Sequence, residues 1–158
     1  MDLEIKKKAL RKIVHGVYVI GVKEGDKVHA FTATWITQVS FKPPLVVAGI
    51  RKDGHSYKMI EKSRVFTINF LGSSQKKIAE HFLKPAPEGK DRLEGIRYKF
   101  GKCGAPILEE AAAYVECEVR EISPGGDHAV VIGEVVEAGL HQDVDPLTLK
   151  ETGWQYGG

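Results

Sequence analysis

The spacing of apolar residues along the chain changes near residue 16. Before that point, apolar side chains recur at helical intervals among lysines, at Leu3, Leu10, Ile13 and Val14. This pattern predicts an amphipathic helix in the first segment of the chain. From residue 16 onward the period is mostly two, as in GVYVIGV (16–22). Alternation of this kind is typical of half-buried strands, so most of the chain is expected to form β-structure.

About seven segments carry the strand pattern, and turn signals separate them. They are 16–22, 28–35, 45–50, 65–71, 97–100, 112–122 and 129–139. Glu24-Gly25-Asp26 is expected to join the first two as a hairpin, and SPGGDH (123–128) to join the last two. Pro43-Pro44 precedes the third segment. Because proline has no backbone N–H, the pair fits outside the strand rather than within a central hydrogen-bond ladder.

Two further helices are expected, over 57–63 and 75–82. Ser73 or Ser74 would cap the second, with its apolar side chains, Ile78, Ala79 and Phe82, turned inward. Strands and helices do not alternate as βαβ units. The expected fold is therefore a mainly β, antiparallel barrel or sandwich with a few peripheral helices, in one domain over 1–158. The loop 84–92 is polar, and the tail, 146–158, is expected to dock on the barrel or on a dimer partner rather than form a regular element.

Composition narrows the class of protein. Hydrophobic residues make up 42% of the 158, enough for a packed core, and the net charge of +2 gives no argument for nucleic acid. Cys103 and Cys117 lack the spacing of a metal site and are expected to be free thiols in a reducing compartment. Because no apolar run has the length of a membrane span and the first residues lack a signal-peptide core, we expect a cytoplasmic protein without a membrane segment.

Familiar catalytic motifs are missing from the sequence. It contains no GxSxG, HExxH, Walker A or GxGxxG pattern. The six histidines have no ligand spacing, so no metal site is predicted, and no catalytic pair stands out among the 21 acidic residues. A hydrolase therefore has no positive evidence.

The segment HAFTATWITQVSFKPPLVVAGIRKDGHS (29–56) carries the most suggestive chemistry. Hydroxyls and cations gather on either side of one apolar run, at Thr32, Thr34, Thr37, Arg51, Lys52, His55 and Ser56. Such groups are the donors that a phosphate needs. The pattern is equally typical of threonines in an ordinary strand followed by an exposed turn, so the spacing alone leaves both interpretations open.

The ordered set of motifs resembles the flavin reductase-like family, the FMN-binding split barrels. FTATWITQVSFKPPLVVAGIRKDGHS resembles the family's signature, a Thr-Ala-Ser/Thr-aromatic step followed by Pro-Pro-Leu and a Lys/Arg- and Ser/Thr-bearing loop. GAPILEEAAAYVECEV (104–119), GGDHAVVIGEVV (126–136) and KDRLEGIRY (90–98) resemble further family segments, although Leu93 stands where the family usually has Phe. Together the matches span about residues 16–139 in the family's order.

The resemblance implies a small antiparallel split barrel, usually a homodimer with FMN near the subunit interface. Thr32, Ala33 and Thr34 would lie along the flavin and its phosphate arm, and Ala48, Gly49 and Ile50 would pass the ring. Arg51, His55 and Ser56 would hold the phosphate. Trp35, Thr37, Lys52 and Arg92 complete the expected cofactor-binding set, and His128 would meet the nicotinamide of NAD(P)H.

The function this implies is hydride transfer from NAD(P)H to FMN, with FAD as another flavin that the pattern allows. Such a step needs no protein acid or base at the reacting carbon, which agrees with the missing catalytic pair. The alternatives are an FMN-binding electron carrier of flavoredoxin type that NAD(P)H does not reduce, and a non-enzymatic flavin-sensing module. A monooxygenase or an electron-transfer protein is the expected partner.

Overall fold

The computed structural model describes residues 1–85 and 91–158, and within them the chain forms four helices and nine strands. The helices are α1 (Leu3–Leu10), α2 (His55–Ser63), α3 (Lys76–Leu83) and α4 (Leu149–Thr152). The strands are β1 (Tyr18–Glu24), β2 (Lys27–Ala33), β3 (Ile36–Ser40), β4 (Leu45–Arg51), β5 (Val65–Phe70), β6 (Tyr98–Phe100), β7 (Pro106–Leu108), β8 (Ala113–Ser123) and β9 (His128–Leu140). Across these two ranges, no helix has the length and apolar character needed to cross a bilayer.

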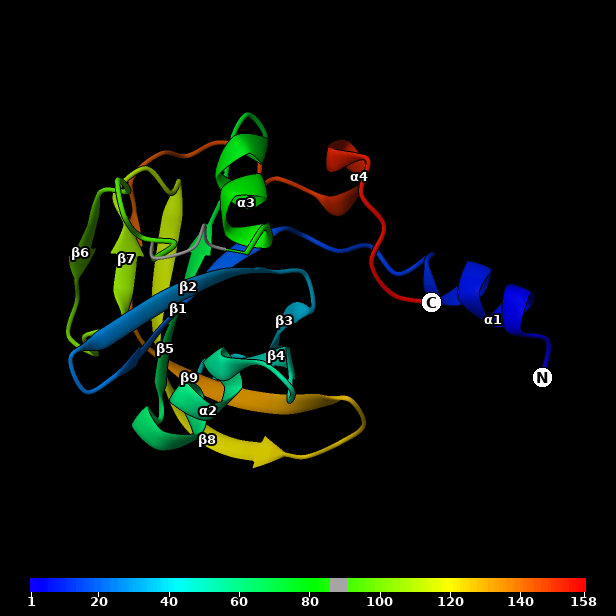
Figure 1. Ribbon diagram of the computed structural model, residues 1–158, viewed down its shortest axis with the longest axis horizontal. Helices are drawn as coiled ribbons and strands as arrows, with labels where there is room; N and C mark the ends of the chain where they lie inside the picture. The colour runs from blue at the N-terminus through cyan, green and yellow to red at the C-terminus, as the bar shows by residue number, and fades with distance from the viewer. Residues whose placement is uncertain (86–90) are drawn as a thin grey trace.

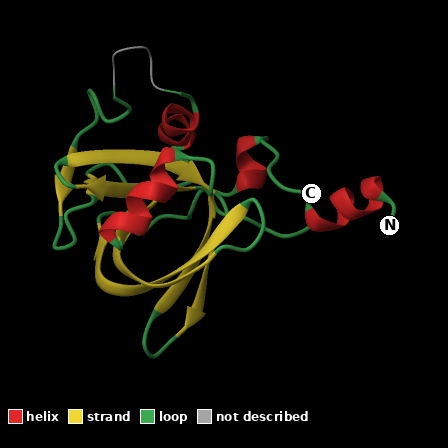
Figure 2. Cartoon of the chain, turned by 60° about the horizontal axis from the view of Figure 1, so that its bottom comes forward, coloured by secondary structure: helices red, strands yellow, loops and turns green. Residues whose placement is uncertain are grey.

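One antiparallel sheet dominates the molecule. Its seven strands run in the order β2-β1-β5-β8-β9-β4-β3, while β6 and β7 form a separate two-stranded hairpin. The large sheet curls around its own core, as Figures 1 and 2 show. β2 and β3 follow each other in sequence but stand at opposite edges, and the pairings leave the sheet open between them. A mainly β, antiparallel fold with few helices is thus confirmed.

Several local predictions need correction. β3 and β7 were not expected: β3 is an edge strand with exposed central residues, and β7 has only three residues, all buried, so neither shows an alternating pattern. The N-cap of α3 is Gln75, and no side chain caps it, because the helix begins too late for Ser73 or Ser74 to reach. The tail contains a regular element after all, the short helix α4 with a capping box between Thr148 and Glu151. The polar loop expected over 84–92 falls partly on 86–90, outside the described residues.

Two apolar clusters hold the fold together. The inside of the curled sheet is filled by one of them, with Ile20, Met59, Ile60, Phe66 and Ile68 fully buried. The other lies between the far side of β1, α3 and the tail, and includes Val19, Leu71, Ala79, Phe82 and Leu147. Ala79 and Phe82 therefore face inward as predicted, and α3 is attached through them. Burial of these side chains supplies the main driving force for folding.

Both cysteines are free thiols. Burial raises the pKa of the Cys103 thiol to about 11 and that of the Cys117 thiol to about 12. The thiolate, which is the reactive form, is therefore disfavoured at both positions, and we assign the cysteines a packing role.

The start and the tail of the described chain lie side by side. Gly16 forms a bridge with Thr148, the Val17 amide donates to the Leu147 carbonyl at 2.9 Å, and the Leu149 amide donates to the His15 carbonyl at 2.9 Å. Beyond this contact α1 projects from the body with no buried residue, next to the end of the tail (Figure 1). The tail thus runs along the segment that precedes β1.

A buried amide joins the small hairpin to the large sheet. The Asn69 side-chain amide donates to the Val19 carbonyl at 3.1 Å, and its oxygen accepts from the Leu108 amide at 2.8 Å. The neighbouring Thr67 hydroxyl donates to the Pro106 carbonyl at 2.6 Å. These side chains therefore attach β7 to β1 and β5, with which β7 forms no backbone ladder.

Replacing Asn69 tests this link. Asn69→Ala leaves two buried backbone groups without their side-chain partner, so the free energy of unfolding should fall by about 2–3 kcal/mol. Urea denaturation measures the change. Gln142→Ala, an exposed amide, is the matched control and should stay within about 0.5 kcal/mol of the parent. An equally small effect at Asn69 would contradict the assigned role.

Candidate functional site

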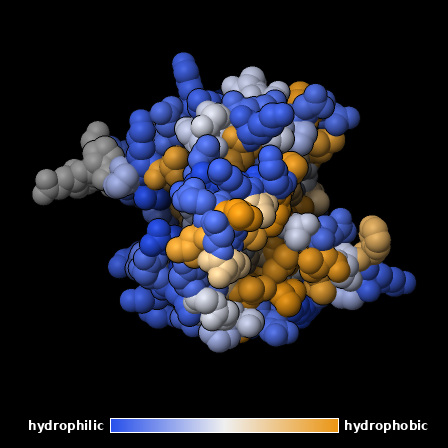
Figure 3. All heavy atoms as spheres, turned by 90° about the vertical axis from the view of Figure 1, so that its right-hand side faces the viewer, coloured by the Kyte–Doolittle hydropathy of each residue, from blue (hydrophilic) through white to orange (hydrophobic). Residues whose placement is uncertain are grey.

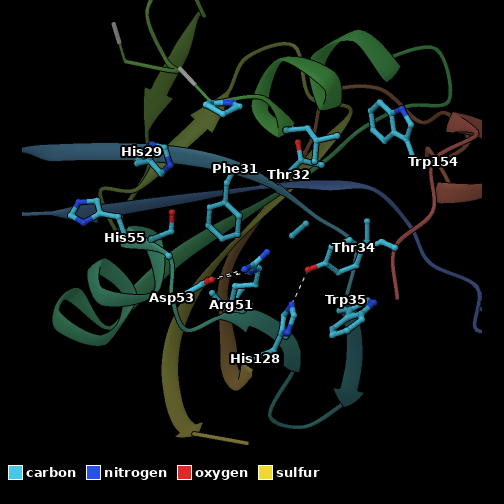
Figure 4. Close-up of a pocket in the computed structure, with 18 of the residues that line it drawn as sticks. His29, Phe31, Thr32, Thr34, Trp35, Arg51, Asp53, His55, His128 and Trp154 are labelled. Atoms are coloured by element: carbon cyan, nitrogen blue, oxygen red, sulfur yellow. Dashed lines mark hydrogen bonds and ion pairs between the residues drawn. The ribbon is translucent and has the colours of Figure 1, made fainter. Parts of the chain in front are cut away.

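A cavity of about 670 Å³ opens between the end of β2, the β4–α2 connection and the tail. This volume lies in the range of small-molecule and cofactor sites. Figure 4 shows its two ends, with His29 and His55 at one and Trp35 and His128 at the other. Most of the predicted site residues line it: Thr32, Ala33, Thr34, Trp35, Gly49, Ile50, Arg51, His55, Ser56, Arg92 and His128.

Three predicted cofactor contacts lie elsewhere. Thr37 is exposed on β3, where its hydroxyl faces the Gln38 carbonyl at 3.4 Å. Ala48 packs into the core of the sheet with 1% of its surface exposed. Lys52 lines a neighbouring cavity instead, because the chain turns away after β4. These three residues belong to the motif in the sequence but do not line the cavity.

The structure adds lining residues that the sequence analysis missed. They are His29, Phe31, Asp53, Gly54, Leu83, Pro85, Leu149, Trp154, Gln155 and Tyr156. His29 and Phe31 could have been found, since alternation along β2 places them on the same face as Ala33. The tail residues carried a weaker signal, namely two aromatic residues in a segment that was expected to dock.

Strand pairing brings the two functional loops together. β4 pairs antiparallel with β9, in a register that sets Arg51 opposite His128. Beyond the strands the Lys52 amide donates to the Asp127 carbonyl at 3.1 Å, and the Gly49 amide donates to the Trp35 carbonyl at 2.9 Å. The loop that follows β4 and the turn that precedes β9 therefore meet at one edge of the cavity, although 76 positions separate their residues 52 and 128 (128 − 52).

One end of the cavity is suited to an anion. α2 begins at His55, two residues earlier than predicted, and its N-cap, Gly54, supplies no side-chain hydrogen bond. Amide groups in the first turn of such a helix lack intrahelical partners and carry partial positive charge. His55 and Ser56, in this first turn, line the cavity together with Arg92. An uncapped helix start beside a guanidinium is a binding site for phosphate by its chemistry.

Two other basic groups at the cavity contribute less charge than their residue types suggest. Burial lowers the pKa of His29, and the nearby cations Arg92 and His55 lower it further, which favours the neutral ring. Arg51 is engaged by Asp53: its Nε donates to Oδ1 at 3.0 Å, and a second bond completes a bidentate pair. This contact lowers the pKa of Asp53, so its carboxylate stays charged beside Arg51.

The opposite end of the cavity is aromatic. The ring of Trp35 lies 4.5 Å from that of His128 and 5.1 Å from that of Tyr156, measured between centroids. Gly49 faces the same indole, and a Cβ at this glycine would stand 3.2 Å from the nearest ring atom. A larger residue would therefore displace Trp35. The arrangement supplies a flat apolar wall without side-chain bulk behind it.

The two threonines between the ends of the cavity differ in their hydrogen bonding. The Thr32 hydroxyl donates to the Ala79 carbonyl at 2.7 Å and so helps to hold α3. The Thr34 hydroxyl is buried and is the sole side-chain polar atom in the described ranges found buried without a hydrogen-bond partner. A buried polar group without a partner is costly in a folded protein unless a ligand or water satisfies it. Thr34 therefore points to a polar ligand in this cavity.

These features fit a flavin that carries a phosphate. Its phosphate suits the start of α2 and Arg92, its planar ring suits the wall of Gly49 and Trp35, and its polar edge or ribityl chain would give the Thr34 hydroxyl a partner. The residues are thus suited to hold such a group.

Comparison with known proteins agrees with this description. The model of the family described as flavin reductase like domain matches residues 10–157. A diflavin flavoprotein A 1 from Synechocystis is 36% identical over 135 residues, covering 85% of this chain and 23% of that protein. An NADH-dependent FAD reductase from Streptomyces globisporus is 34% identical over 125 residues, covering 78% of this chain and 68% of that protein.

The fold has solved counterparts as well. The structure of the flavin reductase HpaC complexed with NADP+ superposes with a TM-score of 0.80 at 28% identity, covering 93% of this chain and 92% of that one. Among the curated relatives, however, the chain spans only 22% to 25% of the length of the diflavin flavoproteins it matches.

The pKa of His29 gives a test of the cavity's electrostatics. Because the folded protein lowers this pKa below the ordinary value of 6.5, the folded state binds fewer protons than the unfolded state below that pH. Above pH 6.5, His29 is neutral in both states and does not reduce the free energy of unfolding. This free energy falls as the pH drops from there through the folded pKa. His29→Gln should lose less stability than the parent between about pH 7.5 and about pH 5 in urea unfolding. Equal losses in both proteins would show that His29 does not titrate as described.

Proposed function

The chain belongs to the flavin reductase-like domain family, and from that premise we propose that it is an NAD(P)H:flavin oxidoreductase with FMN as its flavin. One observation carries the proposal: a single cavity has an uncapped helix start with Arg92 at one end and a flat aromatic wall at the other. That combination matches a molecule with a phosphate at one end and a planar ring at the other.

The residues divide the work of binding by their chemistry. The first turn of α2, with Ser56 and Arg92, takes the phosphate, while Gly49, Ile50 and Trp35 bound the ring. The Thr34 hydroxyl, which has no protein partner, hydrogen-bonds to the flavin. Arg51 is already paired with Asp53 and therefore serves the loop geometry more than the phosphate. This placement refines the predicted phosphate site within residues 51–56 toward its helical end.

Bound flavin would supply the redox chemistry by accepting a hydride from NAD(P)H. The protein's part is to position the two molecules and to exclude water from between them. His128, at the edge of the cavity opposite Arg51, is the residue proposed to meet the nicotinamide. Related proteins are named for NADH or were solved with NADP+, so both donors remain candidates.

The flavin itself has two candidates. One relative is an FAD reductase, and a solved neighbour is an FMN-binding protein from Thermus thermophilus. We favour FMN because the described cavity of about 670 Å³ ends at the start of α2, where the terminal phosphate of FMN would be held. FAD, which continues beyond that phosphate, is the second candidate.

We further propose that the curled sheet is the family's split barrel and that the protein is a homodimer. Apolar side chains gather on one face (Figure 3), and α1 exposes Leu3, Ile5 and Leu10 without an intramolecular cover. Phe41, after β3, is 92% exposed. Exposed apolar surface of this kind marks interaction sites. A cytoplasmic location and a monooxygenase that receives reduced flavin remain predictions.

A second candidate function has its own support. Because the chain spans only about a quarter of the diflavin flavoproteins, its domain also occurs within longer proteins. In that setting it would act as an FMN-binding electron carrier, reduced by another domain or protein rather than by NAD(P)H. The two candidates share the flavin site and differ only on the donor side.

An absorbance spectrum with donor titration distinguishes these functions. The purified protein should carry or take up FMN, turn yellow, and oxidise NADH or NADPH in its presence. Bound FMN without oxidation of either nucleotide would favour the electron carrier. A protein that stays colourless with FMN and FAD and shows no turnover would overturn both.

A pair of arginine variants tests where the phosphate lies. Arg92→Ala should weaken FMN binding by about tenfold or more, since a charge-assisted hydrogen bond contributes roughly 1.5–3 kcal/mol. Arg51→Ala, the matched control, should change it by less than about threefold because Asp53 already occupies that guanidinium. Fluorescence titration with FMN and with riboflavin, which lacks the phosphate, measures both effects. If Arg92→Ala weakened riboflavin binding equally, or if Arg51→Ala had the larger effect on FMN, the placement would be wrong.

A further inference from the structure

His128 has no free hydrogen-bonding atom in this structure. Its Nδ1 lies 2.7 Å from Oδ1 of Asp127, and its Nε2 lies 2.8 Å from the hydroxyl of Tyr156. A carboxylate can only accept, so the proton belongs on Nδ1, and in the neutral ring Nε2 accepts from the Tyr156 O–H. One side of the ring also packs near Trp35. Asp127, His128 and Tyr156 thus form a chain of hydrogen bonds that fixes the imidazole in one orientation.

Tyr156 stands where two cavities meet. It lines the cavity described above and also a neighbouring one of about 980 Å³, formed with Leu10, Ile13 and His15. Trp35, His128, Arg51 and Asp53 line both as well, so the three aromatic rings and the Arg51–Asp53 pair lie between the two cavities. Tyr156 is 38% exposed, and its ring meets the indole edge-on at 5.1 Å. Any molecule that approaches His128 from either side therefore meets the Tyr156 ring.

Side chains keep Tyr156 in this place. In the described ranges, the last backbone–backbone hydrogen bond along the tail is from the Gly153 amide to the Lys150 carbonyl. Beyond it, Arg11 of the segment after α1 donates from Nε to the Gly157 carbonyl at 3.1 Å and from Nη1 to Oε1 of Gln155 at 2.6 Å. Tyr156 lies between these two anchored residues. The segment is thus held by Arg11 outside and by the His128 contact inside.

From this geometry we propose that Tyr156 is a positioning residue for the nicotinamide donor and acts through His128. The inference rests on the proposed function, because it concerns the donor side of that same site. Asp127 fixes the tautomer, and the Tyr156 hydroxyl holds the imidazole in one rotamer, so that His128 keeps one orientation toward the donor. Without the hydroxyl, Asp127 alone restrains the ring, and the donor meets several orientations of it.

A double-mutant cycle tests whether the two residues act as one unit. Tyr156→Phe keeps the ring against Trp35 and removes only the hydroxyl. It should raise KM for the better nucleotide about threefold to tenfold, the range expected for one hydrogen bond, and leave the FMN dissociation constant unchanged. His128→Ala should have an effect at least as large. The double variant should be no worse than His128→Ala alone, since the tyrosine has nothing left to position.

A second measurement does not depend on turnover. Long-range 1H–15N NMR spectra of the flavin-free protein report the tautomer of His128, and the His128→Ala spectrum identifies its signals. The parent should show Nδ1–H with an unprotonated Nε2. In Tyr156→Phe the proton should stay on Nδ1, held by Asp127, while the Nε2 signal should shift because that nitrogen loses its hydrogen bond. Tyr98→Phe, a hydroxyl deletion on β6 far from the cavity lining, is the matched control and should change neither the spectrum nor KM.

The outcomes separate this inference from the function on which it rests. Additive effects in the cycle, an unchanged Nε2 signal of His128 in Tyr156→Phe, or a loss of FMN affinity in that variant would each overturn the positioning role alone. A parent protein that binds FMN but oxidises neither NADH nor NADPH would overturn the proposed function, and the donor-side role with it.

Discussion

The register between β4 and β9 is the constraint on which the site depends. Arg51 stands opposite His128 and Gly49 opposite Val130 in this pairing, and the Gly49 amide also bonds to the carbonyl of Trp35. A slip of one residue would turn every side chain of β4 to the other face of the sheet. The loop after β4 and the turn before β9 would then no longer meet. Neither loop makes a site alone, because one offers charge and hydroxyls and the other offers the imidazole.

Within the cavity, pairing decides which charges are available. Arg51 and Arg92 are both guanidinium groups, yet the first is engaged by Asp53, whereas the second lines the cavity together with the first turn of α2 and donates to the Phe82 carbonyl. His29 sits among cations and is held toward its neutral form by burial. A count of basic residues would therefore overestimate the positive charge that this end of the cavity offers to a ligand. The helix start and a single guanidinium are sufficient to define an anion site there.

Much of this arrangement could be predicted from the sequence, and the failures have physical reasons. Runs of apolar and β-branched residues located β1, β2, β4, β5, β8 and β9, of which β1 and β5 are buried on both faces. β3 is exposed along its middle and β7 is too short to alternate. The motif around Thr32–Ser56 identified most of the cavity, because its two halves lie on strands that the fold brings together. Tyr156 could not be assigned, since its position depends on Arg11 and His128, contacts that join residues far apart in the sequence. Ala48 was misplaced because the alternation within β4 turns it into the core.

The contact between Gly16 and Thr148 has a consequence for attachments to the chain. It places α1 and the end of the tail on the same side of the molecule, beside the tail residues that line the cavity (Figure 1). A domain joined to either end by a short linker would therefore be tethered near the cavity, at an effective concentration on the order of millimolar. Electron exchange with such a neighbour would be limited by reorientation rather than by encounter.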